Sequence, residues 1–234
     1  MCDVCGCGDP EIVPVEVHEA ILAGNDRLAR HNREHFQEAG VLALNVMGSP
    51  GSGKTAILEA TARALRETVR LGAMSADLAT ERDAERLARA GIPAAAITTG
   101  SACHLDAELV HQGLHRLPWR ELDVLFVENV GNLVCPAVYD LGQAANVVVL
   151  SVTEGEDKPL KYPVMFRRAD LVLLSKIDLV PHLDVDLAAI EDAIARTMPE
   201  PRVLRVSART GEGIPAWLAW LQGRRVVPAV SGHR

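Results

Sequence analysis

The chain has 234 residues and is 48% hydrophobic, which suits one α/β domain whose core is mainly aliphatic, because aromatic residues make up only 3%. Its net charge of −7 provides no excess of basic residues to neutralise phosphates, so we expect no binding to nucleic acid. No apolar run reaches membrane-spanning length and the N-terminus is polar and cysteine-rich, so we predict no membrane association and a cytoplasmic location.

The first segment, residues 1–15, is predicted to be a flexible metal-binding tail ahead of a domain at 16–234. Three of the five cysteines of the chain, Cys2, Cys5 and Cys7, lie in it. Removal of Met1 would leave a free α-amine beside a thiolate, and an amine with thiolates suits square-planar Ni²⁺. Zinc or copper is the rival metal, and a disordered tail with incidental cysteines is the alternative to any metal.

After the tail, a helix is predicted over 16–38 and is expected to end at Gly40. Its histidines, His18, His31 and His35, are expected to be solvated. Beyond it, strands are predicted at 41–47, 70–75, 94–98, 123–128, 146–152, 171–175 and 202–207, and helices at 54–67, 80–90, 104–116, 184–197 and 213–222. This alternation predicts an α/β fold with a mostly parallel sheet and helices on both faces. Ligands collect at the carboxyl ends of the strands in such folds.

The run from Gly48 to Thr55 joins the first predicted strand to a helix and reads Gly-Ser-Pro-Gly-Ser-Gly-Lys-Thr. It fits the phosphate-binding P-loop, in which backbone N–H groups and the helix N-terminus surround a polyphosphate. Lys54 is expected to reach the β- and γ-phosphates, and the Thr55 hydroxyl to ligate Mg²⁺. The predicted nucleotide-binding residues of this loop are Gly48, Gly51, Ser52, Gly53, Lys54 and Thr55. The sequence therefore predicts a P-loop NTPase.

Two acidic residues are expected at the same edge of the sheet. Asp77 follows the second predicted strand, where a carboxylate can hold Mg²⁺ and align the attacking water; a helix cap is the alternative for this residue. Glu128 ends the fourth predicted strand, at the place of the Walker-B acid, and offers a hard oxygen to Mg²⁺. Gly131 is expected to donate its N–H to the γ-phosphate. The predicted catalytic residues are Lys54, Asp77 and Glu128, and the predicted Mg²⁺ ligands are Thr55, Asp77 and Glu128.

A second motif predicts which nucleotide base is recognised. Ser175-Lys176-Ile177-Asp178 follows a predicted strand and matches the [N/S/T]-K-x-D box that reads guanine in GTPases. The Asp178 carboxylate would accept from guanine N1–H and the 2-amino group, which adenine does not match, so GTP is favoured over ATP. The Lys176 stem would lie along the base, and Ser207-Ala208 resembles the loop whose backbone N–H contacts guanine O6. A solvated turn is the alternative for such a tetrapeptide.

Cys103, His104 and Cys135 follow the third and fourth predicted strands, so they are expected to meet at the nucleotide end of the sheet. Three soft ligands leave a tetrahedral ion one position short, and water or a residue of another subunit would complete the shell. We therefore predict a nickel or zinc site at a dimer interface. Simple packing of small buried cysteines is the alternative.

Together these motifs resemble the hydrogenase nickel-incorporation GTPases, the HypB-type accessory proteins of the SIMIBI class of P-loop GTPases. The resemblance covers essentially the whole chain. It rests on the Cys-x-x-Cys-Gly-Cys start, the P-loop, the run 77–83, Cys103-His104-Leu105-Asp106, the run 128–136 and the Ser-Lys-Ile-Asp box. It implies Mg²⁺-dependent hydrolysis of GTP to GDP that assists nickel insertion into the [NiFe]-hydrogenase large subunit.

The resemblance also implies a homodimer promoted by GTP or metal. The partners it implies are a small nickel/zinc accessory protein and the precursor of the hydrogenase large subunit. The family often carries a histidine-rich stretch after the first cysteines, and this chain has none, so we expect nickel delivery rather than storage. Asn132 instead of glutamine follows Gly131, so unassisted hydrolysis is expected to be slow. Lys158 and Lys161 are candidates to reach a nucleotide across the dimer, with solvated lysines as the alternative.

Three other functions are alternatives to this one. In the urease nickel-insertion GTPases the interface ligands resemble Cys-Pro-His, whereas here Ala137 follows Cys135-Pro136. A regulatory or metal-sensing GTPase that acts only by binding would not need hydrolysis to deliver metal. A nickel buffer with incidental GTP binding is disfavoured by the full set of phosphate and guanine motifs.

Overall fold

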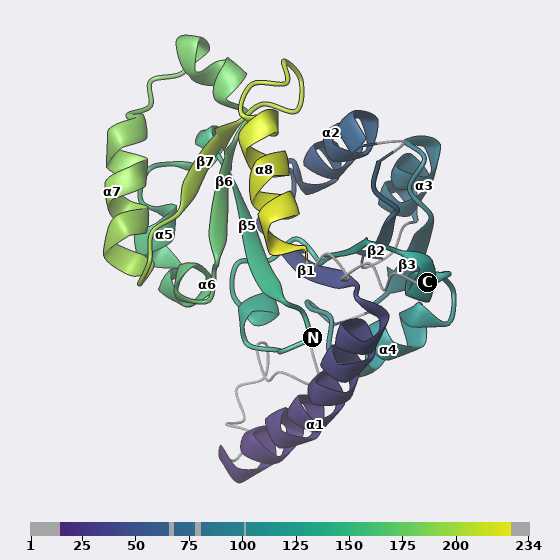
Figure 1. Cartoon of the computed structure of the whole chain (residues 1–234). Helices are drawn as coiled ribbons and strands as arrows, with labels where there is room; N and C mark the ends of the chain where they lie inside the picture. The colour runs from purple at the N-terminus through teal and green to yellow at the C-terminus, as the bar shows by residue number, and fades with distance from the viewer. Residues whose placement is uncertain (1–14, 66–67, 78–80, 101, 226–234) are drawn as a thin grey trace.

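A single parallel sheet organises the molecule in this computed structural model, which describes residues 15–65, 68–77, 81–100 and 102–225, with side chains from Leu22 onward (Figure 1). The sheet has seven strands in the order β3-β2-β4-β1-β5-β6-β7, and every pairing between them is parallel. The strands are β1 (Leu42–Met47), β2 (Leu71–Asp77), β3 (Ala94–Thr98), β4 (Val124–Glu128), β5 (Ala145–Ser151), β6 (Leu171–Ser175) and β7 (Val203–Val206). The prediction of a mostly parallel α/β fold is confirmed.

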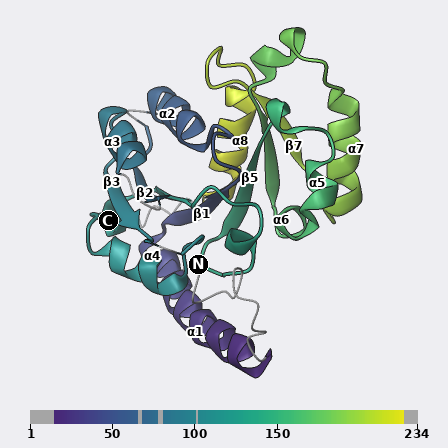
Figure 2. The same cartoon turned by 180° about the vertical axis from the view of Figure 1, so that it is seen from behind.

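Helices cover both faces of this sheet, as Figures 1 and 2 show from opposite sides. They are α1 (Val15–Ala39), α2 (Lys54–Leu65), α3 (Arg82–Arg89), α4 (Ala107–Leu114), α5 (Lys158–Lys161), α6 (Pro163–Arg167), α7 (Leu187–Thr197) and α8 (Ile214–Arg224). The apolar residues of α2, α3 and α8 form one core with the sheet. Those of α1 and α4, and of α6 and α7, form two further cores. None of the described helices combines the length and apolarity needed to cross a bilayer.

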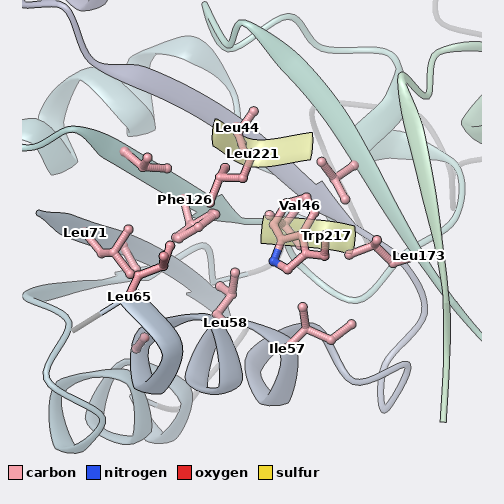
Figure 3. Packing of buried hydrophobic residues seen from close by; sticks show 14 of the residues in the cluster. Leu44, Val46, Ile57, Leu58, Leu65, Leu71, Phe126, Leu173, Trp217 and Leu221 are labelled. Carbon is pink, nitrogen blue, oxygen red and sulfur yellow. The ribbon is translucent and has the colours of Figure 1, made fainter. Parts of the chain in front are cut away.

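The alternation of side chains along β1 shows how one strand serves both faces. Leu44 and Val46 enter the core against α2 and α8, where Trp217 is also buried (Figure 3). Ala43, one position before Leu44, belongs to the core of the other face, together with residues of α1 and α4. Because β1 is buried on both sides, its sequence is apolar almost throughout, as expected for the central strand of a parallel sheet.

Two helices begin three residues later than the sequence pattern predicts, because a capping residue fixes the start. The Asp106 carboxylate accepts a hydrogen bond of 2.8 Å from the Leu109 N–H, so α4 begins at 107 rather than 104. Asp186 caps α7 in the same way, through a 2.8 Å bond from the Ala188 N–H. The helices α5 and α6 were not predicted; they are single turns with proline near their N-termini.

The end of α1 agrees with the prediction at Gly40. Gly40 adopts a φ of 67° and donates its N–H to the Gln37 carbonyl at 3.1 Å, while the Val41 N–H reaches the Phe36 carbonyl at 2.9 Å. This pair of bonds is a Schellman cap, which needs a residue in the left-handed region and therefore favours glycine. The cap turns the chain directly into β1, which leads to the glycine loop.

Candidate functional site

The glycine loop runs from the end of β1 to the first residue of α2, as the sequence predicts. Gly48 has a φ of 147°, and a Cβ there would lie 2.3 Å from the Val149 carbonyl oxygen, so only glycine fits. The Lys54 ammonium donates to the carbonyl oxygens of Gly48 and Ser49, both at 3.1 Å, and burial lowers its pKa. The Lys54 side chain therefore bonds to the backbone of its own loop, and its charge lies at the N-terminus of α2.

A pocket of about 400 Å³ lies in front of this loop. Seven of the predicted residues line it: Gly51, Gly53, Lys54, Thr55, Asp77, Glu128 and Gly131. They come from three separate segments of the chain, which follow β1, β2 and β4, and the parallel sheet brings them to one edge because β4 lies between β2 and β1. The structure thus places the predicted catalytic and Mg²⁺-binding residues around one cavity.

Glu128 is the most buried acid of this pocket, with 3% of its surface exposed. It accepts hydrogen bonds from the Thr55 hydroxyl at 2.6 Å and from the Ser75 hydroxyl at 3.4 Å. Burial raises the pKa of its carboxyl, and the hydrogen bond from Thr55 and the charge of Lys54 oppose that rise. A hydroxyl and carboxylates are the hard oxygen donors that Mg²⁺ prefers, so this set of residues fits that ion.

Arg86 also lines the pocket and was not among the predicted site residues. Its guanidinium makes two 3.0 Å hydrogen bonds to the Glu59 carboxylate and one of 3.2 Å to Asp83. These bonds hold a positive charge at the mouth of a pocket that suits phosphates. The only signal in the sequence was an arginine on the helix that follows Asp77, and arginines on exposed helices are common.

The residues predicted to read guanine lie outside this pocket, at the ends of β6 and β7. The Ser207 hydroxyl donates to the Asp178 carboxylate at 2.6 Å, so the two predicted guanine segments meet. Lys176 has a φ of 60°, the only positive value among the described non-glycine residues, and its side chain passes near Gly53. Ser175 donates to the Ser52 carbonyl at 2.5 Å, which joins this region to the glycine loop. Ala208 follows Ser207 and is half-buried.

Cys103, His104 and Cys135 are brought together, and one potential ligand atom from each lies within 4.8 Å of the others. The two sulfur atoms are 3.0 Å apart, and the Cys103 sulfur is 3.8 Å from Nδ1 of His104. His104 is 2% exposed and stacks on Tyr139 with ring centroids 4.0 Å apart. Burial lowers the pKa of His104, which favours the neutral imidazole that metals bind. Thiolates and imidazole suit nickel and zinc.

The loop that follows β4 contacts both the phosphate-binding glycine loop and the group formed by Cys103, His104 and Cys135, called here the Cys-His cluster. Gly48 forms an isolated antiparallel bridge with Asn132, and a Cβ on Gly131 would lie 2.7 Å from the Pro50 side chain. The same loop reaches Cys135, which begins a turn of 3₁₀-helix. At its other end, Asn129 accepts a hydrogen bond of 3.1 Å from the Leu105 N–H, next to His104. One loop therefore contacts the phosphate-binding loop and both halves of the Cys-His cluster.

Other predicted residues lie elsewhere. Cys2, Cys5 and Cys7 fall outside the described residues. Lys161 pairs with Asp157 at 2.6 Å on an exposed turn, and the Lys158 ammonium lies 5.3 Å from the centroid of the Tyr162 ring. Both lysines thus have local partners within the chain, and the role predicted for them across a dimer stays a prediction.

Comparison with known proteins gives a consistent result. Residues 42–205 match the family described as CobW/HypB/UreG, nucleotide-binding domain. The chain is 50% identical over 211 residues to the hydrogenase maturation factor HypB of Azotobacter vinelandii, covering 90% of this chain and 70% of that protein. It is similar in structure to the HypB of Archaeoglobus fulgidus, with a TM-score of 0.81 and 40% identity over 86% of this chain and 98% of that one. It is also similar to HypB of Helicobacter pylori in complex with nickel, with a TM-score of 0.82 and 38% identity over 86% and 95% of the two chains.

Proposed function

Since the chain belongs to the CobW/HypB/UreG family, and within it to the HypB hydrogenase maturation factors, we propose that it hydrolyses GTP and uses the cycle to assist nickel insertion into the [NiFe]-hydrogenase large subunit. The similar Helicobacter pylori protein was solved with nickel, which supports Ni²⁺ as the cargo. The intrinsic rate is proposed to be slow, because Asn132 occupies the position where fast GTPases carry a water-positioning glutamine.

The phosphates would bind at the glycine loop, and Lys54 would exchange its two carbonyl partners for the β- and γ-phosphate oxygens. Bound Mg²⁺ would supply neutralisation of the charge that develops on those oxygens. Thr55 and Glu128, already joined by a 2.6 Å bond, and Asp77 are the residues proposed to hold it. Asp77 would also orient the attacking water, and the Gly131 N–H would contact the γ-phosphate.

Guanine would be selected at the ends of β6 and β7. The bond from Ser207 fixes one oxygen of Asp178, so that the carboxylate is oriented before the base arrives. Guanine N1–H and the 2-amino group would donate to this carboxylate, while adenine would leave it poorly paired. Lys176 would lie along the base and the backbone of Ala208 would contact O6.

The observation that carries the proposal is the loop between Glu128 and Cys135. It lies against the phosphate-binding loop through Gly131 and the Gly48–Asn132 bridge, and it ends at a sulfur of the Cys-His cluster. Contact of Gly131 with a γ-phosphate would therefore constrain Cys135. Because Asn129 also fixes the backbone beside His104, both sides of the cluster would respond to the nucleotide.

The Cys-His cluster is proposed to bind nickel or zinc at the interface of a homodimer promoted by GTP or metal. Three ligands leave one coordination position for water or for the second subunit. Val134 and Val138 flank Cys135 and are 48% and 39% exposed, so apolar surface borders the cluster. Residues 1–15 are proposed as a separate nickel-binding segment through Cys2, Cys5 and Cys7, and residues 16–234 as the GTPase domain. The accessory protein and the hydrogenase large-subunit precursor are the proposed partners.

Thermodynamic reciprocity provides the test of coupling. We would titrate Ni²⁺ into the protein with GDP or a non-hydrolysable GTP analogue, and titrate each nucleotide with and without Ni²⁺. Coupling between sites is typically about 1–3 kcal/mol, or several-fold to a hundredfold in affinity, and each ligand must shift the other by the same factor. The Cys135→Ala variant should lose one ion per chain, metal-induced dimerisation and this shift, whereas Cys5→Ala should lose only the tail site.

Two results would contradict the proposal. Binding constants for nickel and GTP that do not depend on each other would leave two unrelated sites on one chain. Equal affinity for ATP and GTP would exclude the guanine assignment.

A further inference from the structure

A group of three histidines lies where α1 packs against α4 (Figure 2). His31 and His35 are one turn apart on α1, and His111 lies on α4. The ring centroids of His31 and His35 are 4.1 Å apart, and those of His31 and His111 are 5.4 Å apart. The prediction that the histidines of the first helix are solvated is wrong for His35, which is half-buried and stacks on Trp119 with ring centroids 5.8 Å apart.

The three rings present ligand atoms at nearly the spacing of a metal site. One ring nitrogen from each histidine lies within 4.8 Å of the other two. Nitrogen ligands at 2.0–2.1 Å from a tetrahedral ion lie about 3.4 Å from one another, so small rotations of the rings would bring them to that spacing. His31 is exposed and the other two are half-buried, so such rotations need no change in the core.

The orientation of His111 is set by a buried amide. Asn32 is fully buried and donates from its Nδ2 to the carbonyl oxygens of Ala107 at 2.9 Å and Leu141 at 3.2 Å. Its Oδ1 must then be an acceptor, so the 3.0 Å contact with His111 is a bond donated by the Nδ1–H of the ring. The Nε2 lone pair of His111 is left for a ligand. A histidine held through its other nitrogen in this way is typical of metal sites.

A second, independent observation supports a ligand bound by these three histidines, and it concerns His35. Its Nδ1 is buried and has no hydrogen-bond partner among the described residues. Buried polar atoms without a partner are rare in folded proteins, and a coordinated ion would satisfy the ring. Burial, and then the charges of His31 and His111, lower the pKa of His35, so the neutral ring predominates at neutral pH.

From this geometry we infer that His31, His35 and His111 form a binding site for a divalent nickel or zinc ion, separate from the cysteine-containing cluster. Imidazole is a preferred ligand of these ions, whereas Mg²⁺ prefers oxygen. Three protein ligands leave the fourth position open, as in sites whose ion exchanges with solvent or a second ligand. The site therefore suits an exchangeable ion rather than one that holds the fold together.

Trp119 provides a local probe, because it stacks on His35 and bound Ni²⁺ quenches neighbouring indole fluorescence. We would titrate NiCl₂ into the full-length protein with GDP bound and follow tryptophan emission. The His31→Gln and His111→Gln variants should shift the quenching midpoint by at least about tenfold, which is the lower end of the effect of losing a supporting contact to a metal ligand. His182→Gln, an exposed histidine on another element, is the matched control and should leave the midpoint unchanged.

Different spectroscopic signals distinguish nickel binding at the histidine group from nickel binding at the cysteine-containing sites. Thiolate-to-nickel absorption reports the cysteine-containing sites and should be unchanged in His31→Gln, while Cys135→Ser should leave the Trp119 quenching in place. GDP affinity checks that each variant is folded. Equal quenching midpoints in the wild type, His31→Gln and His111→Gln would overturn the inference, and so would loss of the quenching in Cys135→Ser.

Discussion

The phosphate pocket and the Cys-His cluster lie at the same edge of the sheet but are built in different ways. In the pocket, Lys54 and Glu128 are 7% and 3% exposed and are hydrogen-bonded within the chain. In the cluster, Cys103 and Cys135 are only half-buried and apolar residues beside them are exposed. The described residues of the first site are enclosed by the chain, whereas the second site combines one buried imidazole, His104, with two half-buried sulfur atoms. The buried site has its polar groups bonded within the chain, and the half-open cluster is the one for which we propose that a second subunit completes the metal shell.

The largest effect in this comparison is expected for Lys54→Ala. Removal of a charge that contacts the transferred phosphoryl group should lower GTP hydrolysis by about 10²–10³-fold or more. Metal binding at the cluster should keep its stoichiometry, because Lys54 makes no contact with Cys103, His104 or Cys135. Phosphate release and nickel equilibrium dialysis measure the two results. Arg196→Ala, which removes an exposed basic side chain on α7 that pairs with Asp192 of the same helix, is the control. Equal loss of activity in both variants would mean that the pocket is not the catalytic site.

Asp178→Asn tests the part of the nucleotide site that lies outside the pocket. The amide of asparagine would place an N–H donor opposite the N–H donors of guanine. The binding free energy of GTP should therefore weaken by about 2–4 kcal/mol, while that of ATP changes little. Competition binding with both nucleotides measures this difference. Asp184→Asn, on an exposed loop, should leave both affinities unchanged. A uniform loss for ATP and GTP would point to misfolding instead of base selection.

Gly131→Ala acts on the loop that the two sites share. A new Cβ would lie 2.7–2.9 Å from atoms of Pro50, so the loop must move away from the phosphate-binding loop. Such overpacking typically costs about 1–3 kcal/mol, and we expect lower affinity for GTP and a smaller effect of GTP on nickel binding. Gly24→Ala, where a Cβ meets nothing within 4 Å, is the control. Full retention of the mutual effect in Gly131→Ala would separate the loop from the coupling.

Asp123→Asn is expected to have the smallest effect, and only on stability. Hydrogen bonds from Arg70, first among the causes, hold the pKa of Asp123 below its usual value. A carboxyl with a lowered folded-state pKa contributes stability above the unfolded pKa of about 3.9 and loses it as the pH falls through the folded value. The variant should therefore unfold at lower temperature than the wild type at pH 7, and this difference should shrink below pH 4. Both sites should keep their ligand affinities, since Asp123 precedes β4 at the other edge of the sheet.

Much of the fold follows from local patterns in the sequence. Each described strand lies within one or two residues of its predicted range, because strands of a parallel sheet are continuous apolar runs bounded by polar residues. The convergence of Lys54, Asp77 and Glu128 also follows, since the carboxyl ends of parallel strands share one edge. The predicted helix boundaries were less accurate. Helix starts depend on capping side chains such as Asp106, and the spacing of apolar residues carries no information about such caps.

The contacts that the sequence did not predict are those between distant segments. Arg86 lines the pocket because Glu59, on another helix, orients it. His104 is buried against Tyr139, and His35 faces His111, only because the tertiary fold brings loops and helices together. Neither residue type nor spacing predicts these pairings. They require the packing of α1 on α4 and the path of the loop after β4.

The position of β1 in the sheet has a consequence for the order of folding. Both neighbours of this strand, β4 and β5, come from far along the chain, since Leu42 pairs with Val124 and Leu44 with Ala145. When the glycine loop has just been synthesised, β4 and β5 do not yet exist, so β1 has no neighbouring strand on either side. Pairings of such sequence separation fold slowly, because the entropy of closing long loops is lost before the contacts form. We therefore expect that a ribosome-bound chain becomes competent to bind nucleotide only after β5 has emerged, and that shorter fragments expose an apolar β1 to chaperones.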